Sequence, residues 1–206
     1  MKTLFDAQIR PLVDRLLNPV GRGLAARGVT ANHITIFGLL LGLAAALCVA
    51  LQRFDLAFWL IALNRVADGL DGAVARASVA TDFGGYLDIV CDFVFYSAVP
   101  LAFAAAQPAN ALAAAFLIFS FIGTASSFLA FAILAEKHNI STEIRGSKAF
   151  YYIGGLTEGT ETILLLLAMV TWPGYFIFMA FGFGLLCWVT TITRIHAAYG
   201  QFGELQ

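Results

Sequence analysis

The chain has 206 residues, of which 60% are hydrophobic and only 12% are charged, and its formal net charge at pH 7 is −1. Together with a mean hydropathy of +0.84, this composition excludes an ordinary soluble domain. No basic face with interleaved aromatic residues indicates nucleic-acid binding. We therefore expect an integral membrane protein whose ligands are lipids and small molecules.

The first thirty residues predict an amphipathic helix rather than a cleaved signal peptide. Apolar residues such as Leu12 and Leu16 are interleaved with charged residues such as Asp14 and Arg15. A helix of this pattern lies in the membrane interface, with its arginines toward anionic lipid. A lead-in that only connects to the first span is the alternative.

Six apolar stretches follow, each long enough to cross a hydrocarbon core of about 30 Å. They lie near residues 33–51, 56–77, 84–105, 110–135, 150–171 and 174–197. Basic residues concentrate before the first stretch and between the fourth and fifth, so the positive-inside rule predicts that both termini are cytoplasmic. We expect an all-α integral membrane fold in one domain, residues 1–206, with an interfacial helix in 1–31 and a six-helix transmembrane core in 32–198.

Four aspartates flank the turn between the second and third predicted spans. Asp68 and Asp71 are three residues apart and Asp88 and Asp92 are four apart, so each pair projects from one face of its own helix. Because the two helices are antiparallel neighbours, the four carboxylates can converge on the cytoplasmic side. Ionised residues at membrane depth are costly and are usually functional or paired.

Clustered carboxylates repel one another unless cations lie among them, and hard oxygen ligands select Mg²⁺ or Mn²⁺. We expect two such ions, which would clamp a pyrophosphate. Neighbouring glycines permit close approach of a ligand, and Arg76 offers a guanidinium fork to phosphate oxygens. The pattern favours metal-assisted phosphoryl transfer. The alternatives are a buried ion network with Arg65 and Arg76, and a carboxylate-based transporter of protons or cations.

These residues resemble the signature of the CDP-alcohol phosphotransferases, Asp-x-x-Asp-Gly-x-x-Ala-Arg, then a spacer, then Gly-x-x-x-Asp-x-x-x-Asp. Every fixed residue is present between Asp68 and Asp92. The spacer, residues 77–83, is one residue shorter than usual, and Ala31 stands where the family usually has Pro before Asn32. Residues 151–162 resemble a bacterial inner-membrane branch of this class-I CDP-alcohol phosphatidyltransferase family.

The resemblance implies a step of phospholipid biosynthesis. The phosphatidyl group of CDP-diacylglycerol would pass to a hydroxyl of a small polar acceptor, releasing CMP. The protein would lie in the bacterial inner membrane as a homodimer, with its active site facing the cytoplasm. Gly38 and Gly42 form a Gly-x-x-x-Gly pair that permits close helix contact within or between subunits. An inactive structural relative and a transporter are the alternative functions.

The resemblance also implies roles for single residues. Asp68, Asp71, Asp88 and Asp92 would hold the metal ions, and Asp92 would in addition be the general base that deprotonates the acceptor hydroxyl. The residues that would contact the CDP-lipid are Asn32, Thr35, Gly72, Arg76 and Thr81.

The acceptor stays open among glycerol 3-phosphate, inositol phosphate, serine and other polyols. A phosphorylated acceptor would need cations, and the candidates are Lys137, Arg145, Lys148 and Arg194, which also suit the positive-inside rule. Glu158 and Glu161 would bind an amino group or polyol hydroxyls, or else pair with Lys148 and Arg194. Pro100, eight residues after Asp92, resembles the serine-using members of the family.

Overall fold

The computed structural model describes residues 6–138 and 156–203. Within these ranges the protein is helical and contains no strand, which confirms the predicted all-α class. The helices are α1 (Asp6–Ala25), α2 (Ala31–Ala50), α3 (Phe54–Ala77), α4 (Asp82–Ala106), α5 (Ala111–Lys137), α6 (Gly159–Thr171) and α7 (Phe176–Phe202), with short 3₁₀-helices η1 (Pro108–Asn110) and η2 (Pro173–Tyr175).

Four helical stretches are long and apolar enough to cross a membrane, namely Ala31–Ala50, Asp82–Ala106, Pro108–Lys137 and Pro173–Phe202. α3 is as long, with 24 residues, but five ionisable side chains interrupt its apolar sequence. α6 has 13 residues, and at about 1.5 Å per residue it reaches only part of the way across a hydrocarbon core. The six spans stay a prediction, whereas the described residues contain four helices that are able to cross a membrane.

The fifth predicted span begins later than its hydropathy indicated. Residues 156–158 are not helical, and α6 starts at Gly159 with Glu158 as its N-cap. The Glu158 side chain accepts a hydrogen bond from the backbone N–H of Glu161, and the Glu161 carboxylate accepts one from the backbone N–H of Glu158 at 3.2 Å. This reciprocal capping box fixes the helix start, which an apolar run of sequence does not reveal.

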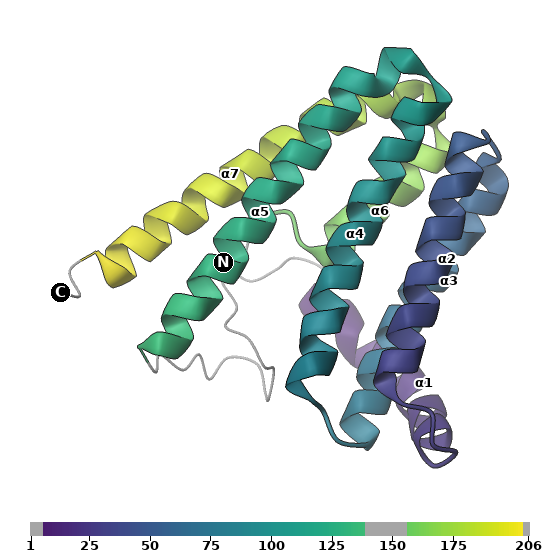
Figure 1. Ribbon diagram of the computed structural model, residues 1–206, viewed down its shortest axis with the longest axis vertical. Coiled ribbons are helices and arrows are strands. Elements are labelled where there is room, and N and C mark those ends of the chain that lie inside the picture. The colour runs from purple at the N-terminus through teal and green to yellow at the C-terminus, as the bar shows by residue number, and fades with distance from the viewer. Residues whose placement is uncertain (1–5, 139–155, 204–206) are drawn as a thin grey trace.

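The helices form two groups that meet along α4 (Figure 1). α2 packs against α3 and α4, and α6 packs against α3, while α5 packs against both α4 and α7. α5 and α7 lie side by side and lean away from α4 toward the end of the bundle at which α3 passes into α4. Large fully buried side chains, including Phe95, Phe103, Leu117, Leu166 and Phe176, join the two groups in one core.

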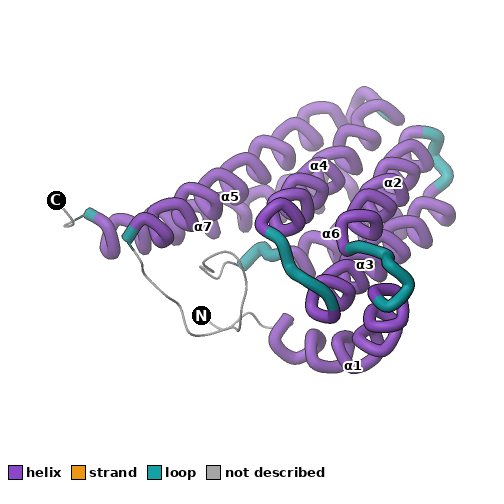
Figure 2. The backbone as a smooth tube through the Cα atoms, turned by 60° about the horizontal axis from the view of Figure 1, so that its bottom comes forward, coloured by secondary structure: helices purple, strands orange, loops and turns teal. Residues whose placement is uncertain are grey.

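α1 lies across one end of the bundle and packs against α3 (Figure 2). Gly21 makes this approach close, because a Cβ atom at Gly21 would lie 2.8 Å from the backbone carbonyl carbon of Ala73. The end that α1 covers is also the end where α3 stops and α4 starts. An orientation across the bundle suits the predicted interfacial helix, whose position in a membrane stays a prediction.

The two glycines of α2 serve packing within the chain. Gly38 faces Asn64 and Ala67 of α3, and Gly42 faces the ring of Phe95 in α4, and both glycines are buried. The absence of side chains at these two positions lets α2 approach both neighbouring helices.

Gly42→Ala should destabilise the protein more than Gly38→Ala. A Cβ at position 42 would lie 2.5 Å from the Phe95 ring, which is only 1% exposed, whereas a Cβ at position 38 would meet the Ala67 methyl at 3.4 Å. Overpacking costs about 1–3 kcal/mol, and the gain in helix propensity is common to both variants. Thermal unfolding in detergent measures the difference, and equal melting temperatures would contradict this account of the packing.

Candidate active site

The hairpin of α3 and α4 positions the four aspartates. Asp68 and Asp71 lie in the second half of α3, and Asp88 and Asp92 lie in the first half of α4. Thr81 is the N-cap of α4, and its hydroxyl accepts a hydrogen bond from the backbone N–H of Gly84 at 3.1 Å. This cap fixes where α4 begins and hence which face of α4 turns toward α3.

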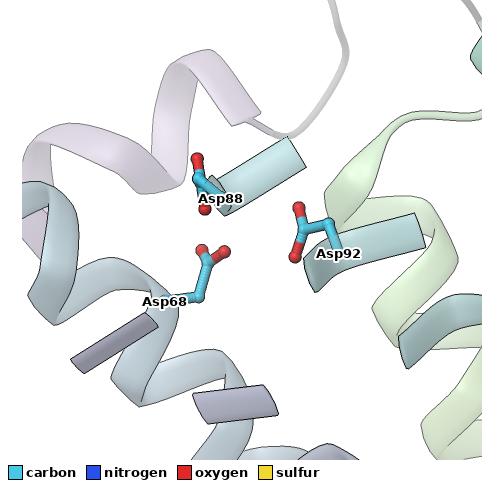
Figure 3. A group of neighbouring side chains, drawn as sticks. All are labelled: Asp68, Asp88 and Asp92. Atoms are coloured by element: carbon cyan, nitrogen blue, oxygen red, sulfur yellow. The ribbon is translucent and has the colours of Figure 1, made fainter. Parts of the chain in front are cut away.

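Asp68, Asp88 and Asp92 converge, since each offers a carboxylate oxygen that lies within 4.8 Å of the other two. Figure 3 shows the three carboxylates, one from α3 and two from α4, pointing toward one another. Arg65, which precedes Asp68 by three residues, forms an ion pair with it at 2.5 Å. The charge of Arg65 offsets one of the three carboxylates. An all-oxygen donor set at these separations fits a hard divalent cation such as Mg²⁺ or Mn²⁺.

Asp71 lies beside this cluster rather than within it. Its side chain is buried, and its carboxylate accepts a hydrogen bond from the Thr35 hydroxyl of α2 at 2.7 Å. All four aspartates nevertheless line one cavity, together with Thr35 and Asn64. The resemblance assigned all four aspartates to the metal ions, whereas the structure gives Asp71 a hydrogen-bond partner of its own. Its role as a metal ligand stays a prediction.

Two residues at this site, Asn64 and Tyr96, were missed by the sequence analysis. Asn64 lines the cavity, and its amide donates to the carbonyl of Gly38 at 2.8 Å, which ties α3 to α2. The Tyr96 hydroxyl donates to the Asp92 carboxylate at 3.1 Å. Asn64 precedes Asp68 by four residues and Tyr96 follows Asp92 by four, so helical spacing was the signal that could have found both.

The predicted nucleotide contacts gather around the turn between α3 and α4. Asn32 and Thr81 flank Gly84, because the Asn32 amide oxygen and the Thr81 hydroxyl would each lie 3.1 Å from a Cβ at Gly84. A side chain at position 84 would therefore separate the start of α2 from the start of α4. The structure brings Asn32 and Thr81 together, and it places Thr35 on Asp71.

Arg76 reaches from α3 to α1. Its Nη2 donates to the Asn18 amide oxygen at 3.1 Å. Its Nη1 lies 3.2 Å from the position that a Cβ at Gly72 would take. Gly72 thus leaves room for the guanidinium, which lies along α3 one turn beyond Asp71.

Tyr96 connects Asp92 to α5 and α6. The Tyr96 hydroxyl lies 3.4 Å from the Cβ position of Gly159, the first residue of α6. The ring of Tyr96 lies 6.4 Å, centroid to centroid, from the ring of Phe121 in α5. The part of the site around Asp92 is therefore bounded by the start of α6 and by the face of α5 that carries Phe121.

Arg194 of α7 lies on that same face of α5. Its side chain is 6% exposed, its Nη1 donates to the Thr124 carbonyl at 3.0 Å, and its guanidinium stacks over the Phe128 ring at 5.7 Å. Phe121, Thr124 and Phe128 share one helix face. The Arg194 Nε is buried and has no hydrogen-bond partner among the described residues. Such an unsatisfied buried donor is costly unless a ligand or water completes it.

Of the other candidates for acceptor binding, Lys137 is exposed at the end of α5, and Arg145 and Lys148 lie outside the described residues. Glu158 and Glu161 cap α6, a helix-starting role that was not among the alternatives predicted for them. Glu158 also lies close enough to Arg194 to interact with it electrostatically, which agrees with one of the predicted alternatives.

The sequence is similar to one family of known proteins over most of its length. Residues 28–195 match the sequence profile of the CDP-alcohol phosphatidyltransferase family. The inner membrane protein YnjF of Escherichia coli K12 is 47% identical over 204 residues, which cover 98% of this chain and 99% of YnjF. Archaetidylinositol phosphate synthase of Pyrococcus horikoshii is 41% identical over 87 residues, which cover 42% of this chain and 46% of that enzyme.

Crystal structures of the phosphatidylinositol phosphate synthase of Mycobacterium tuberculosis share the fold. The structure with CDP-DAG bound superposes with a TM-score of 0.72 at 22% identity, covering 90% of this chain and 94% of that one. The structure in complex with manganese and citrate gives a TM-score of 0.70, also at 22% identity, covering 89% and 88% of the two chains.

Proposed function

The chain belongs to the CDP-alcohol phosphatidyltransferase family, and we propose that it transfers the phosphatidyl group of CDP-diacylglycerol to a hydroxyl of a small phosphorylated acceptor, with release of CMP. The observation that carries this proposal is the meeting of Asp68, Asp88 and Asp92 within 4.8 Å. All three belong to the family signature, and no other part of the described chain concentrates acidic ligands in this way.

Asp68, Asp88 and Asp92 would hold Mg²⁺ or Mn²⁺, with Asp71 as a further ligand, and we propose two ions. When bound, such ions neutralise the diphosphate of the donor and make the attacked phosphorus more electrophilic. The manganese complex of the mycobacterial relative supports this assignment. The remaining donor contacts are proposed for Asn32, Thr35, Gly72, Arg76 and Thr81.

Asp92 acts as the general base. It takes the proton of the acceptor hydroxyl, and the acceptor oxygen then forms a bond to the β-phosphorus of the CDP-lipid. The bond from that phosphorus to the oxygen bridging the two phosphates breaks, and CMP leaves. Tyr96 supports this role because its hydroxyl donates to Asp92 at 3.1 Å and so orients the carboxylate.

Arg194 favours a phosphorylated acceptor. Its buried guanidinium is held by Thr124 and Phe128 on the face of α5 that also contacts Tyr96. A guanidinium in this position suits an acceptor phosphate, since it would complete the unsatisfied Nε. Lys137 and Arg145 are proposed as further cations for the acceptor phosphate. The inositol phosphate products named for two relatives support the same class of acceptor.

The membrane arrangement is also a proposal. Six spans in a single domain, with both termini and the aspartates on the cytoplasmic face of a bacterial inner membrane, agree with the basic residues before α2 and with α1 lying at the aspartate end of the bundle. The assembly is proposed to be a homodimer.

Release of CMP tests the function. Purified full-length protein is incubated with CDP-diacylglycerol, Mn²⁺ or Mg²⁺, and separately with glycerol 3-phosphate, inositol phosphate, inositol or serine. CMP should form with a phosphorylated acceptor, and EDTA should abolish its formation until the divalent ion is restored. Absence of CMP with every acceptor would contradict the proposal, and the best substrate would identify the product lipid.

A further inference from the structure

A second cavity lies between α1 and the C-terminal turns of α3, the helix that also carries Asp68 and Asp71. Its volume is about 240 Å³, and it is lined by Asn18, Arg22, Ala73, Arg76 and Ala77. The two alanines form an apolar floor, and the other three side chains are polar. The described lining residues include two arginines and no carboxylate, so the cavity suits an anionic group.

Arg76 belongs both to this cavity and to the family signature. One guanidinium nitrogen bonds Asn18 of α1, and the other lies near the Cβ position of Gly72, which is also part of the signature. Asn18 and Gly72 thus restrict the plane of the guanidinium. A fixed guanidinium plane matters because the fork can bind two phosphate oxygens only in the correct orientation.

α1 is held firmly enough to contribute to a site. Gly21 allows its backbone to approach Ala73 closely, and Asn18 and Arg22, four residues apart, share the helix face that lines the cavity. The contact is therefore specific in register as well as in position.

We propose that α1 forms one wall of the donor site, in which Arg22 and Arg76 bind phosphate oxygens of the CDP moiety and Asn18 is a positioning residue for Arg76. This inference rests on the proposed function, and it extends the donor site beyond the signature to a helix outside the transmembrane core. The proposed ligand of the cavity is a phosphate group of the nucleotide headgroup.

Arg22→Gln tests the wall directly. With full-length protein in detergent and Mn²⁺ present, the Kd of CDP should rise about fivefold to tenfold through loss of one charge-assisted contact. The KM for CDP-diacylglycerol should rise similarly while kcat changes less than twofold. Arg27→Gln is the matched control, because Arg27 follows α1 and does not line the cavity. Its Kd and KM should equal those of the parent protein.

Asn18→Leu tests the positioning role. It should raise the Kd of CDP in the parent protein but cause no further rise in an Arg76→Gln background, because the Asn18 effect passes through Arg76. A general loss of structure would instead lower the affinity in both backgrounds.

An unchanged CDP affinity in Arg22→Gln would overturn the inference even if the parent protein releases CMP. A change confined to stimulation by phosphatidylglycerol in mixed vesicles would also overturn it, and would assign the cavity to a bilayer phospholipid. If the parent protein releases no CMP, the proposed function fails, whereas Arg22-dependent CDP binding would still support the nucleotide wall.

Discussion

Asp92→Asn should lower kcat for CMP release by a factor of about 10³ while the affinity for CDP-diacylglycerol stays within a few fold of the parent value. Loss of a general base costs about 10²–10⁴ in rate, and a factor of 10³ corresponds to about 4 kcal/mol of transition-state stabilisation. Asn has the shape of Asp and retains an oxygen that can accept from Tyr96, so the hydrogen bond from the Tyr96 hydroxyl is preserved. Initial rates at saturating acceptor, together with donor binding, measure the two quantities.

Two further variants separate the base from the metal ligands. Asp88→Asn should raise the Mn²⁺ concentration needed for half-maximal activity, as Asp92→Asn also should, because both residues belong to the same oxygen cluster. At saturating Mn²⁺, however, kcat should fall far less in Asp88→Asn than in Asp92→Asn, because Asp88 is not the base. Asp55→Asn, exposed in the first turn of α3 at the other end of the helix, should behave as the parent protein. A kcat of Asp92→Asn close to that of the parent would remove Asp92 from the role of base.

The convergence of Asp68, Asp88 and Asp92 could be predicted because it depends on local geometry. Spacing of three and four residues places side chains on one helix face, and a short turn makes the two helices neighbours. The N-cap at Thr81 is also a local feature with a recognisable residue type. These elements required no knowledge of how distant parts of the chain pack.

The finer divisions within the site could not be predicted, because they depend on long-range packing. Asp71 receives its hydrogen bond from a residue 36 positions away, and Arg76 bonds a residue 58 positions away. These partners follow from how α2 and α1 pack on α3, which hydropathy does not specify. Tyr96 and Glu158 are different cases. Their hydrogen bonds to Asp92 and to Glu161 are local, but a tyrosine in an apolar helix suggests packing, and a glutamate near a span suggests function.

The structure also shows that the signature residue Gly72 lies beside the exposed side chain of Arg76 at the end of α3. The guanidinium occupies the space beside Gly72 and bonds α1. Sequence spacing assigns both residues to the donor without indicating that one makes room for the other. Through Arg76, this pairing connects α1 to the residues of the proposed chemistry.

Arg194→Gln should raise the KM for the phosphorylated acceptor about tenfold to a hundredfold, as expected when a charge-assisted contact to phosphate is lost. The donor KM should remain near the parent value. The side chain also bonds the Thr124 carbonyl, so a loss of stability of about 1–3 kcal/mol is expected as well. Arg194→Lys keeps the charge but not the fork, and its acceptor KM should lie between those of the parent and Arg194→Gln.

Comparison of a phosphorylated with an unphosphorylated acceptor separates binding from packing. If Arg194 binds the phosphate, Arg194→Gln should lose most of the parent protein's preference for inositol phosphate over inositol, because only the phosphorylated acceptor loses a contact. If Arg194 only joins α5 to α7, turnover of both acceptors should fall together and the preference should persist, which would exclude the binding role. His196→Gln, exposed on the same helix, should leave the preference unchanged and control for substitution near the end of α7.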